Sequence, residues 1–214
     1  MSDRTILQAY RQPFGYYMEE LVADYFRQQE KLVLSHDRNH FDYNKSDNNK
    51  IKESLSILFG RLSKVSLCSE YFLQKLDEKS NISGLEYLIG SNTIEMFRFE
   101  GYKPIISEVK SQYGVNDLDY RIEFNKGQIS LLRELDDVGV ESSLIYCIAL
   151  PYARFIEIPF KDIRSALEKS NRIRIPISYR SKNLYTSLTN ANYTDKDTLI
   201  SAIKLKYPNL KRDF

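Results

Sequence analysis

The order of the apolar patterns along the chain constrains its fold more than any other feature. The segments NTIEMFRFE and KPIISEVKSQY flank Gly101, and they predict a β-hairpin or two adjacent strands. A helix with an Asn start signal and a Gly stop signal is predicted over NKGQISLLRELDDVG, and the runs ESSLIYCIAL and ARFIEIPF predict two further strands. A hairpin, a helix and two more strands form the layer pattern of a mixed α/β domain with one core.

Other segments add elements around this pattern. Residues 14–29 carry apolar side chains at helical spacing, and residues 195–207 predict a closing helix. Residues 37–91 interrupt the pattern and are interpreted as an insertion, with a polar loop first and one long or two shorter helices over 53–80. The smaller predicted elements are a short strand at KLVLSHD, a short helix at SALEKSNR and an extended segment at RIRIPISYR.

The composition is that of an ordinary globular protein, with 42% hydrophobic and 28% charged residues. The chain shows no signal peptide and no apolar run long enough to span a membrane, so we expect a soluble intracellular protein. Cys68 and Cys147 are interpreted as buried thiols, although a disulfide between them would indicate an oxidising compartment. His36 and His40 lie in a polar loop and are interpreted as surface residues.

Charge is distributed unevenly along the chain. Residues 161–214 contain 12 Lys and Arg against 5 Asp and Glu, although the net charge of the whole protein is only +2. The remaining residues are therefore acidic overall. A basic end on an acidic body favours a polyanionic partner, and a solvated basic face is the alternative interpretation.

The triplet Glu108-Val109-Lys110 is the main candidate for chemistry. On a strand, residues i and i+2 point to the same face, so Glu108 and Lys110 would lie side by side while Val109 faces the core. A second acidic-x-Lys triplet at residues 77–79 lies in a helical pattern, where i and i+2 do not share a face. The pair at 108 and 110 is either a surface ion pair or part of an active site.

A further carboxylate, Glu95, lies on the preceding predicted strand. The hairpin would bring this strand alongside the one that carries Glu108, and the two carboxylates could then hold Mg²⁺, with Mn²⁺ as a substitute. The Val109 carbonyl could supply another oxygen ligand. Lys110 could orient a water molecule or stabilise charge in a phosphoryl transition state. The pattern outlines a phosphodiester hydrolase.

These residues resemble the PD-(D/E)XK nuclease superfamily. The run IEMFRFEGYKPIISEVKS is similar to its core, in which an acidic residue on one strand is followed, after a hairpin, by (D/E)-x-K on the next strand. The resemblance places Glu95 at the first acidic position, and Glu108 and Lys110 at the second pair. It implies an α/β fold of the restriction-endonuclease-like type, with a mixed central sheet flanked by helices and a helical insertion.

Two flanking features resemble nucleases related to archaeal Holliday-junction resolvases, and the nucleases of archaeal spindle-shaped viruses are similar in size and character. These features are Gly15 followed by Glu19 on the first helix, and Gln128 early in the helix after the E-x-K strand. The resemblance implies catalytic roles for Glu19 and Gln128. It covers residues 14–36 and 92–160 of a single domain over 1–214, with the insertion at 37–91 and a basic C-terminal extension over 161–214.

The match leaves alternatives open. The first acidic position is usually Asp, and Glu86 competes with Glu95 for it. Glu20 competes with Glu19 on the first helix. Asp117 and Asp119 could add metal ligands, although a loop role fits them better. Each of these residues could instead be a surface charge or a polar cap.

The C-terminal extension offers a predicted nucleic-acid-binding surface. Cations can neutralise phosphates, and interleaved tyrosines can pack on sugars or splayed bases. No base-reading motif is present, which favours structure-selective cutting over recognition of a defined sequence. The resemblance to resolvases implies a homodimer or higher homo-oligomer. The predicted DNA-binding cations are Arg172, Arg174, Arg180 and Lys182.

Three hypotheses follow from the sequence. The first is a Mg²⁺-dependent DNA endonuclease that acts on branched DNA such as Holliday junctions. The second is a nucleic-acid-binding protein with a catalytically decayed nuclease fold. The third is an α/β protein in which the E-x-K triplet is only an ion pair.

Overall fold

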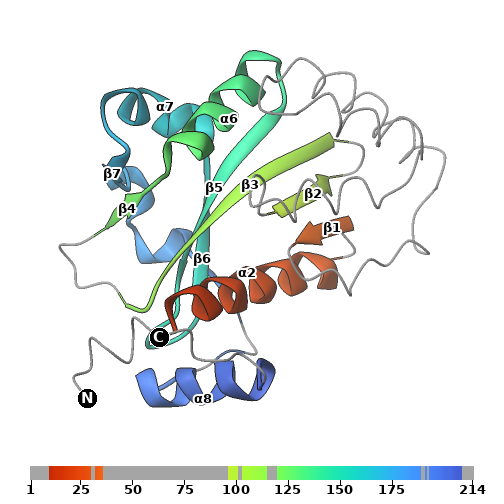
Figure 1. The fold of residues 1–214 in the computed structure, drawn as a ribbon, viewed down its shortest axis with the longest axis vertical. Coiled ribbons are helices and arrows are strands. Elements are labelled where there is room, and N and C mark those ends of the chain that lie inside the picture. Colours follow the sequence, from red (N-terminus) through yellow and green to blue (C-terminus); the bar gives the residue numbers. More distant parts are fainter. Residues whose placement is uncertain are drawn as a thin grey trace.

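A computed structural model describes residues 10–29, 32–35, 96–100, 103–114, 120–188, 191 and 193–208. The predicted insertion over residues 37–91 lies outside these ranges, so its predicted helices cannot be compared with the structure. The described helices and strands are arranged in two helical layers around a central sheet (Figure 1).

The central sheet is mixed. Its six described strands have the order β1-β2-β3-β5-β6-β8. β3 and β5 run parallel, and every other pair in this sheet is antiparallel. The sheet strands are β1 (Leu32–Ser35), β2 (Met96–Glu100), β3 (Lys103–Gln112), β5 (Glu141–Ile148), β6 (Arg154–Pro159) and β8 (Thr186–Ser187).

Helices cover the sheet, and a small second sheet lies beside it. A parallel pair requires a crossover connection, and α6 supplies it between β3 and β5. The predicted α/β class, with a mixed sheet flanked by helices, is confirmed. The remaining elements are α2 (Arg11–Gln28), α6 (Lys126–Asp137), α7 (Phe160–Lys169) and α8 (Lys196–Lys206), the paired strands β4 (Arg121–Glu123) and β7 (Arg172–Arg174), and the 3₁₀ turns η2 (Ile177–Tyr179) and η3 (Lys182–Leu184).

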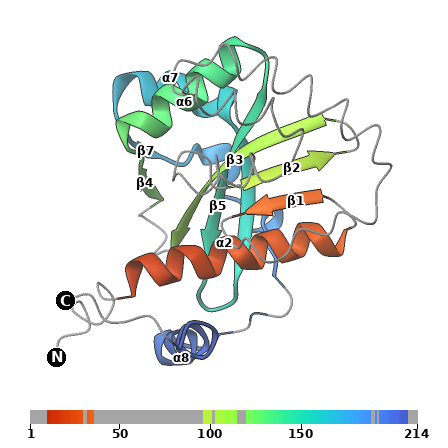
Figure 2. The same ribbon diagram turned by 45° about the vertical axis from the view of Figure 1, so that its right-hand side comes forward.

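The two faces of the sheet carry separate cores. On one face, α2 and α8 pack against side chains such as Val109 and Ile145. On the other face, α6 and α7 pack against side chains such as Leu144 and Tyr146. Figure 2 shows α2 and α6 on different sides of β3 and β5. Because β5 is buried on both faces, nearly all of its residues are buried.

Several predicted boundaries are confirmed and others are wrong. α6 has the predicted Asn125 cap, and it is followed by Gly139 in the left-handed region at φ 72°. The short helix predicted at SALEKSNR instead begins at Phe160 and ends at Lys169. The segment RIRIPISYR is a strand only over its first three residues and then turns into η2.

The C-terminal part of the chain contributes to the core. Leu199 and Ile203 on α8 are buried in the same cluster as Val22 on α2. β8 pairs with β6 at the edge of the main sheet. The described residues between 161 and 208 are therefore packed against the rest of the described chain. None of the helices in the described ranges combines the length and the apolar character needed to cross a bilayer.

A buried arginine connects four strands of the sheet. Arg98 on β2 is 1% exposed, and it donates two hydrogen bonds to the Glu157 carboxylate on β6, at 2.5 and 2.6 Å. It also donates to Ser107 Oγ on β3, and Ser143 Oγ on β5 donates to Glu157. The Phe26 ring of α2 lies 4.5 Å from the guanidinium carbon. A buried charge is costly unless it is paired in this way.

We predict that Glu157→Gln destabilises the fold by about 3 kcal/mol, because it leaves the Arg98 charge without its bidentate partner. Urea denaturation gives the free energy of unfolding. Glu168→Gln is the matched control, because Glu168 is half exposed and faces Arg164 at 3.5 Å. The control should leave the free energy nearly unchanged. Equal effects of the two substitutions would contradict the role assigned to Arg98.

Candidate active site

β3 sends neighbouring side chains to opposite faces of the sheet. Val109 belongs to the core beneath α2. Glu108 and Lys110 alternate with it and point to the face covered by α6, where their parallel partners on β5 are Leu144 and Tyr146. The geometry predicted for the triplet, with Glu108 and Lys110 on one face and Val109 in the opposite core, is confirmed.

Glu108 and Lys110 form an ion pair that is largely buried. Lys110 Nζ lies 2.7 Å from Glu108 Oε1, and the Glu108 side chain is only 5% exposed. A carboxylate in this setting loses most of its hydration, and the neighbouring ammonium compensates for part of that loss. The interpretation of the triplet as a surface ion pair therefore does not describe this pair.

The N-terminus of α6 fixes Lys110 from the other side. Lys110 Nζ donates a hydrogen bond to Gln128 Oε1 at 3.0 Å. The same oxygen accepts from the backbone N–H of Asn125 at 3.0 Å, while the Asn125 side chain accepts from the Gln128 N–H at 2.7 Å. Gln128 is thus held by a capping box. The structure brings together Glu108, Lys110 and Gln128, as the sequence predicted.

The ammonium group of Lys110 keeps some capacity for a ligand. Among the described residues it contacts the Glu108 carboxylate, the Gln128 amide oxygen and the Phe124 ring, whose centroid is 5.4 Å away. An ammonium has three N–H donors; Gln128 Oε1 accepts from one of them, and the Glu108 carboxylate lies at ion-pair distance. Lys110 remains partly exposed. A remaining donor can therefore reach an oxygen of a bound substrate.

The two glutamates of the first helix have different surroundings. Glu20 accepts a hydrogen bond from Tyr207 Oη at 3.0 Å and pairs with Lys206, so it links α2 to the end of α8. Glu19 is also buried, at 4% exposure. Glu19 lies on α2, which covers the Val109 face of the sheet, whereas Glu108 and Lys110 point to the α6 face.

The remaining predicted carboxylates fall outside the described residues. These are Glu95, Glu86, Asp117 and Asp119. The described register pairs Met96 of β2 with Ser107 of β3. In the sequence, Glu95 precedes Met96 and Glu108 follows Ser107.

This site supplies part of a ligand set for a divalent cation. Within the described ranges, no group of three or more His, Cys, Asp or Glu could hold a metal ion. Glu108 and the Val109 carbonyl are hard oxygen donors of the kind that Mg²⁺ prefers. The donor type therefore fits Mg²⁺, and Glu95 remains the predicted second carboxylate.

The predicted DNA-binding cations lie on and after the β4–β7 ribbon. Arg172 pairs with Glu123 at 2.6 Å, so its charge is partly neutralised. Arg174 is exposed and lies opposite Arg121 in the antiparallel register. Lys182 is exposed on η3.

Sequence reasoning missed the roles of two residues on the α6 side of the sheet. Asn125 was recognised only as a helix cap, although the N-x-x-Q spacing of a capping box could have linked it to Gln128. Arg154, at the start of β6, was not singled out, and no local pattern identifies it. It contacts Tyr185, which lies far along the chain.

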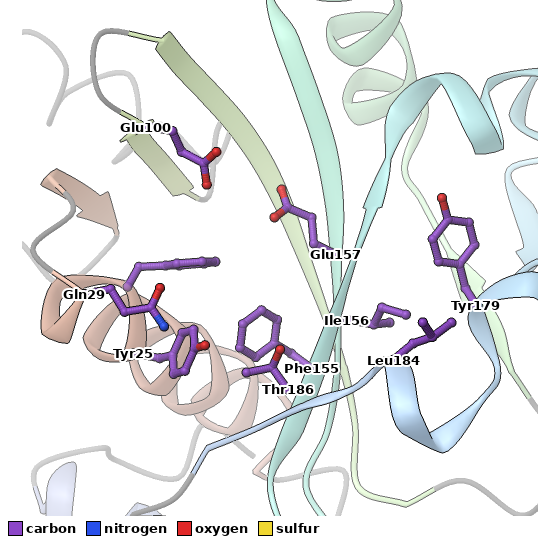
Figure 3. A pocket seen from close by; sticks show the side chains of 10 residues that line it. Tyr25, Gln29, Glu100, Phe155, Ile156, Glu157, Tyr179, Leu184 and Thr186 are labelled. Atoms are coloured by element: carbon purple, nitrogen blue, oxygen red, sulfur yellow. The ribbon is translucent and has the colours of Figure 1, made fainter.

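A pocket of about 380 Å³ lies away from these residues, and its lining includes neither Glu108, Lys110 nor Gln128. It is formed at the edge of β6, beside the end of α2. Figure 3 shows the Glu100 and Glu157 carboxylates pointing toward one another in it. Glu157 is already bound to Arg98.

Comparisons with protein-family models, curated proteins and solved structures find no match to this chain.

We predict a strong energetic coupling between Glu108 and Lys110. A double-mutant cycle with Glu108→Gln, Lys110→Met and the double variant should give a coupling of about 1.5–3 kcal/mol, as for charged hydrogen bonds away from water. Urea denaturation of the four proteins measures it.

The exposed pair Glu123 and Arg172 supplies the control cycle, because its side chains are 54% and 62% exposed. Its coupling should be much smaller, since water screens both charges. Couplings of equal size in the two cycles would show that the Glu108–Lys110 pair behaves as a surface ion pair.

Proposed function

We propose that this protein is a metal-dependent DNA endonuclease with a restriction-endonuclease-like fold. The observation that carries the proposal is the position of Lys110, held between the Glu108 carboxylate and the Gln128 amide oxygen on one face of β3. These are three of the five residues that the resemblance to PD-(D/E)XK nucleases assigns to catalysis. A partly buried, oriented lysine beside a carboxylate is suited to phosphodiester hydrolysis.

The arrangement of the elements supports the proposal. The predicted hairpin is present as β2 and β3, and α6 crosses from β3 to the parallel strand β5. The E-x-K strand therefore has an antiparallel neighbour on one side and a parallel neighbour on the other. This connectivity agrees with the core expected from the resemblance.

Each side chain has a proposed role in the reaction. Glu108, the Val109 carbonyl and Glu95 would hold Mg²⁺. The chemistry that a bound Mg²⁺ supplies is the polarisation of a phosphoryl oxygen and a lower pKa for a coordinated water. Lys110 donates hydrogen bonds to the attacking water or to the phosphoryl oxygens, and Gln128 holds the ammonium group in place.

The substrate is proposed to be DNA of a particular shape, such as a branched junction. Cations near the site are exposed on the β4–β7 ribbon, and they can contact phosphates regardless of sequence. A homodimer acting inside the cell would place two such sites on the two strands of a junction. A binding protein with a decayed nuclease fold is the alternative, and the intact Glu108–Lys110 pair argues against it.

We predict that Lys110→Met abolishes metal-dependent DNA cleavage and leaves DNA binding within about threefold, because one of several phosphate contacts is lost. End-labelled four-way junction, flapped, duplex and single-stranded DNA would be incubated with Mg²⁺, Mn²⁺ or EDTA. Lys161→Met, an exposed lysine on α7, is the control and should cut normally. Binding of every substrate without cleavage of any would favour the decayed fold.

We predict that Asn125→Ala lowers the cleavage rate at least tenfold, because Gln128 loses a partner and holds Lys110 less firmly. The free energy of unfolding should fall by about 1 kcal/mol through the lost cap. Asp195→Ala is the matched control, because it removes the same type of capping box from α8. Its stability loss should be comparable and its cleavage rate unchanged. Equal rates for both variants would exclude a positioning role for Asn125.

A further inference from the structure

Two arginines on the α6 side of the sheet carry charges that no carboxylate balances. Arg154 donates to the backbone carbonyls of Leu150 and Tyr152, at 3.3 and 3.1 Å. Arg180 donates to the carbonyl of Ile175 at 2.7 Å. Among the described residues, neither guanidinium lies within ion-pair distance of an acidic group.

Four other arginines of the described chain differ in this respect, whereas Arg133 on α6 also donates to a backbone carbonyl, that of Leu167 at 3.2 Å, and makes no ion pair with a described residue. Each of the four makes an ion pair with a carboxylate, whereas Arg154 and Arg180 lie instead over tyrosine rings. The Arg154 guanidinium is 5.8 Å from the centroid of Tyr185, and that of Arg180 is 5.3 Å from the centroid of Tyr120. The paired arginines are Arg27, Arg98, Arg164 and Arg172.

A hydroxyl group on the ring beneath Arg154 also lacks a hydrogen-bond partner among the described residues. Within the described part of the chain, Tyr185 Oη is buried and makes no hydrogen bond. Burial, and secondarily Tyr120, raises the pKa of Tyr185 to about 12, although the positive charges of Arg154 and Arg180 lower it. The hydroxyl therefore stays protonated at neutral pH and can donate. A buried donor without an acceptor is costly, and an anion would satisfy it.

These groups are connected to the candidate active site through two rings. Tyr146 on β5 is the parallel partner of Lys110, and its hydroxyl donates to Gln112 on β3 at 2.7 Å. The Tyr146 ring lies against Tyr120, with centroids 6.5 Å apart. Arg180 lies over that same Tyr120 ring. Lys110 and the two arginines are thus on one side of the sheet.

We propose that Arg154, Arg180 and the Tyr185 hydroxyl form a binding site for a phosphoryl oxyanion. Guanidinium groups bind phosphate oxygens through paired N–H donors, and the phenol adds a third donor. The source of the phosphate is either a nucleic-acid backbone that also reaches Lys110, or free inorganic phosphate. The first source rests on the proposed nuclease function, whereas the second does not.

The test measures binding in EDTA, so that it is independent of cleavage. A fluorescent single strand and a four-way junction are titrated with wild type, Arg154→Gln, Arg180→Gln and Tyr185→Phe. In parallel, the melting temperature is followed with inorganic phosphate, with chloride at equal ionic strength as the reference. Arg164→Gln is the control, because Arg164 is already paired with Asp136 and Asp137.

Each arginine substitution should weaken DNA binding about tenfold or more. It should also lower by about 1 the steepness with which the logarithm of affinity falls against the logarithm of salt concentration, whereas the control should change neither quantity. Tyr185→Phe should weaken binding about threefold without lowering the melting temperature, which separates a lost contact from misfolding. If phosphate stabilises wild type but not the arginine variants, and DNA binding is unchanged, the oxyanion site is retained and nucleic acid is excluded as the source of the phosphate. The proposal would be overturned if all three variants matched wild type both in DNA affinity and in stabilisation by phosphate.

Discussion

The parallel pairing of β3 with β5 is the constraint on which the rest of the structure depends. It requires a crossover, and α6 is that crossover. The helix must then begin near the end of β3 and pack on the face to which Glu108 and Lys110 point. Gln128, in the first turn, reaches Lys110 for this reason. The contact between strand and helix is a consequence of topology, and the capping box with Asn125 only refines its geometry.

The alternation of side chains along β3 separates stability from chemistry. Val109 contributes to the core under α2, and its neighbours Glu108 and Lys110 remain available to the opposite face. The Arg98–Glu157 pair lies on the Val109 face and joins the strands there. Polar residues on one face can therefore serve the sheet while those on the other bind a ligand. A change at Arg98 would lower the stability of the fold, and under the proposed function a change at Lys110 would also abolish cleavage.

The elements around the hairpin could be predicted because their signals are local. Two apolar runs that flank Gly101 predicted β2 and β3, and an Asn start signal with a Gly stop signal predicted α6. The start of α7 was missed because Phe160 continues the apolar run of β6, so hydrophobicity does not change at the boundary. β8 has two residues and no recognisable pattern. Among the site residues, Glu108 and Lys110 were found through their spacing on a strand, and Gln128 through the resemblance to a nuclease family. Arg154 and Tyr185 are adjacent only through folding, so spacing could not link them.

The charges on the α6 face are distributed in a way that stability alone does not explain. A buried carboxylate and ammonium pair commonly contributes less to folding than apolar side chains of the same volume. Arg154 and Arg180 add positive charge on the same side of the sheet, and neither is balanced by a carboxylate of the described chain. The Tyr185 hydroxyl adds a buried donor without an acceptor. A phosphate bound at Arg154, Arg180 and Tyr185 would supply the negative charge and the acceptor oxygens together. The features that cost folding energy are thus the ones that a bound polyanion would satisfy.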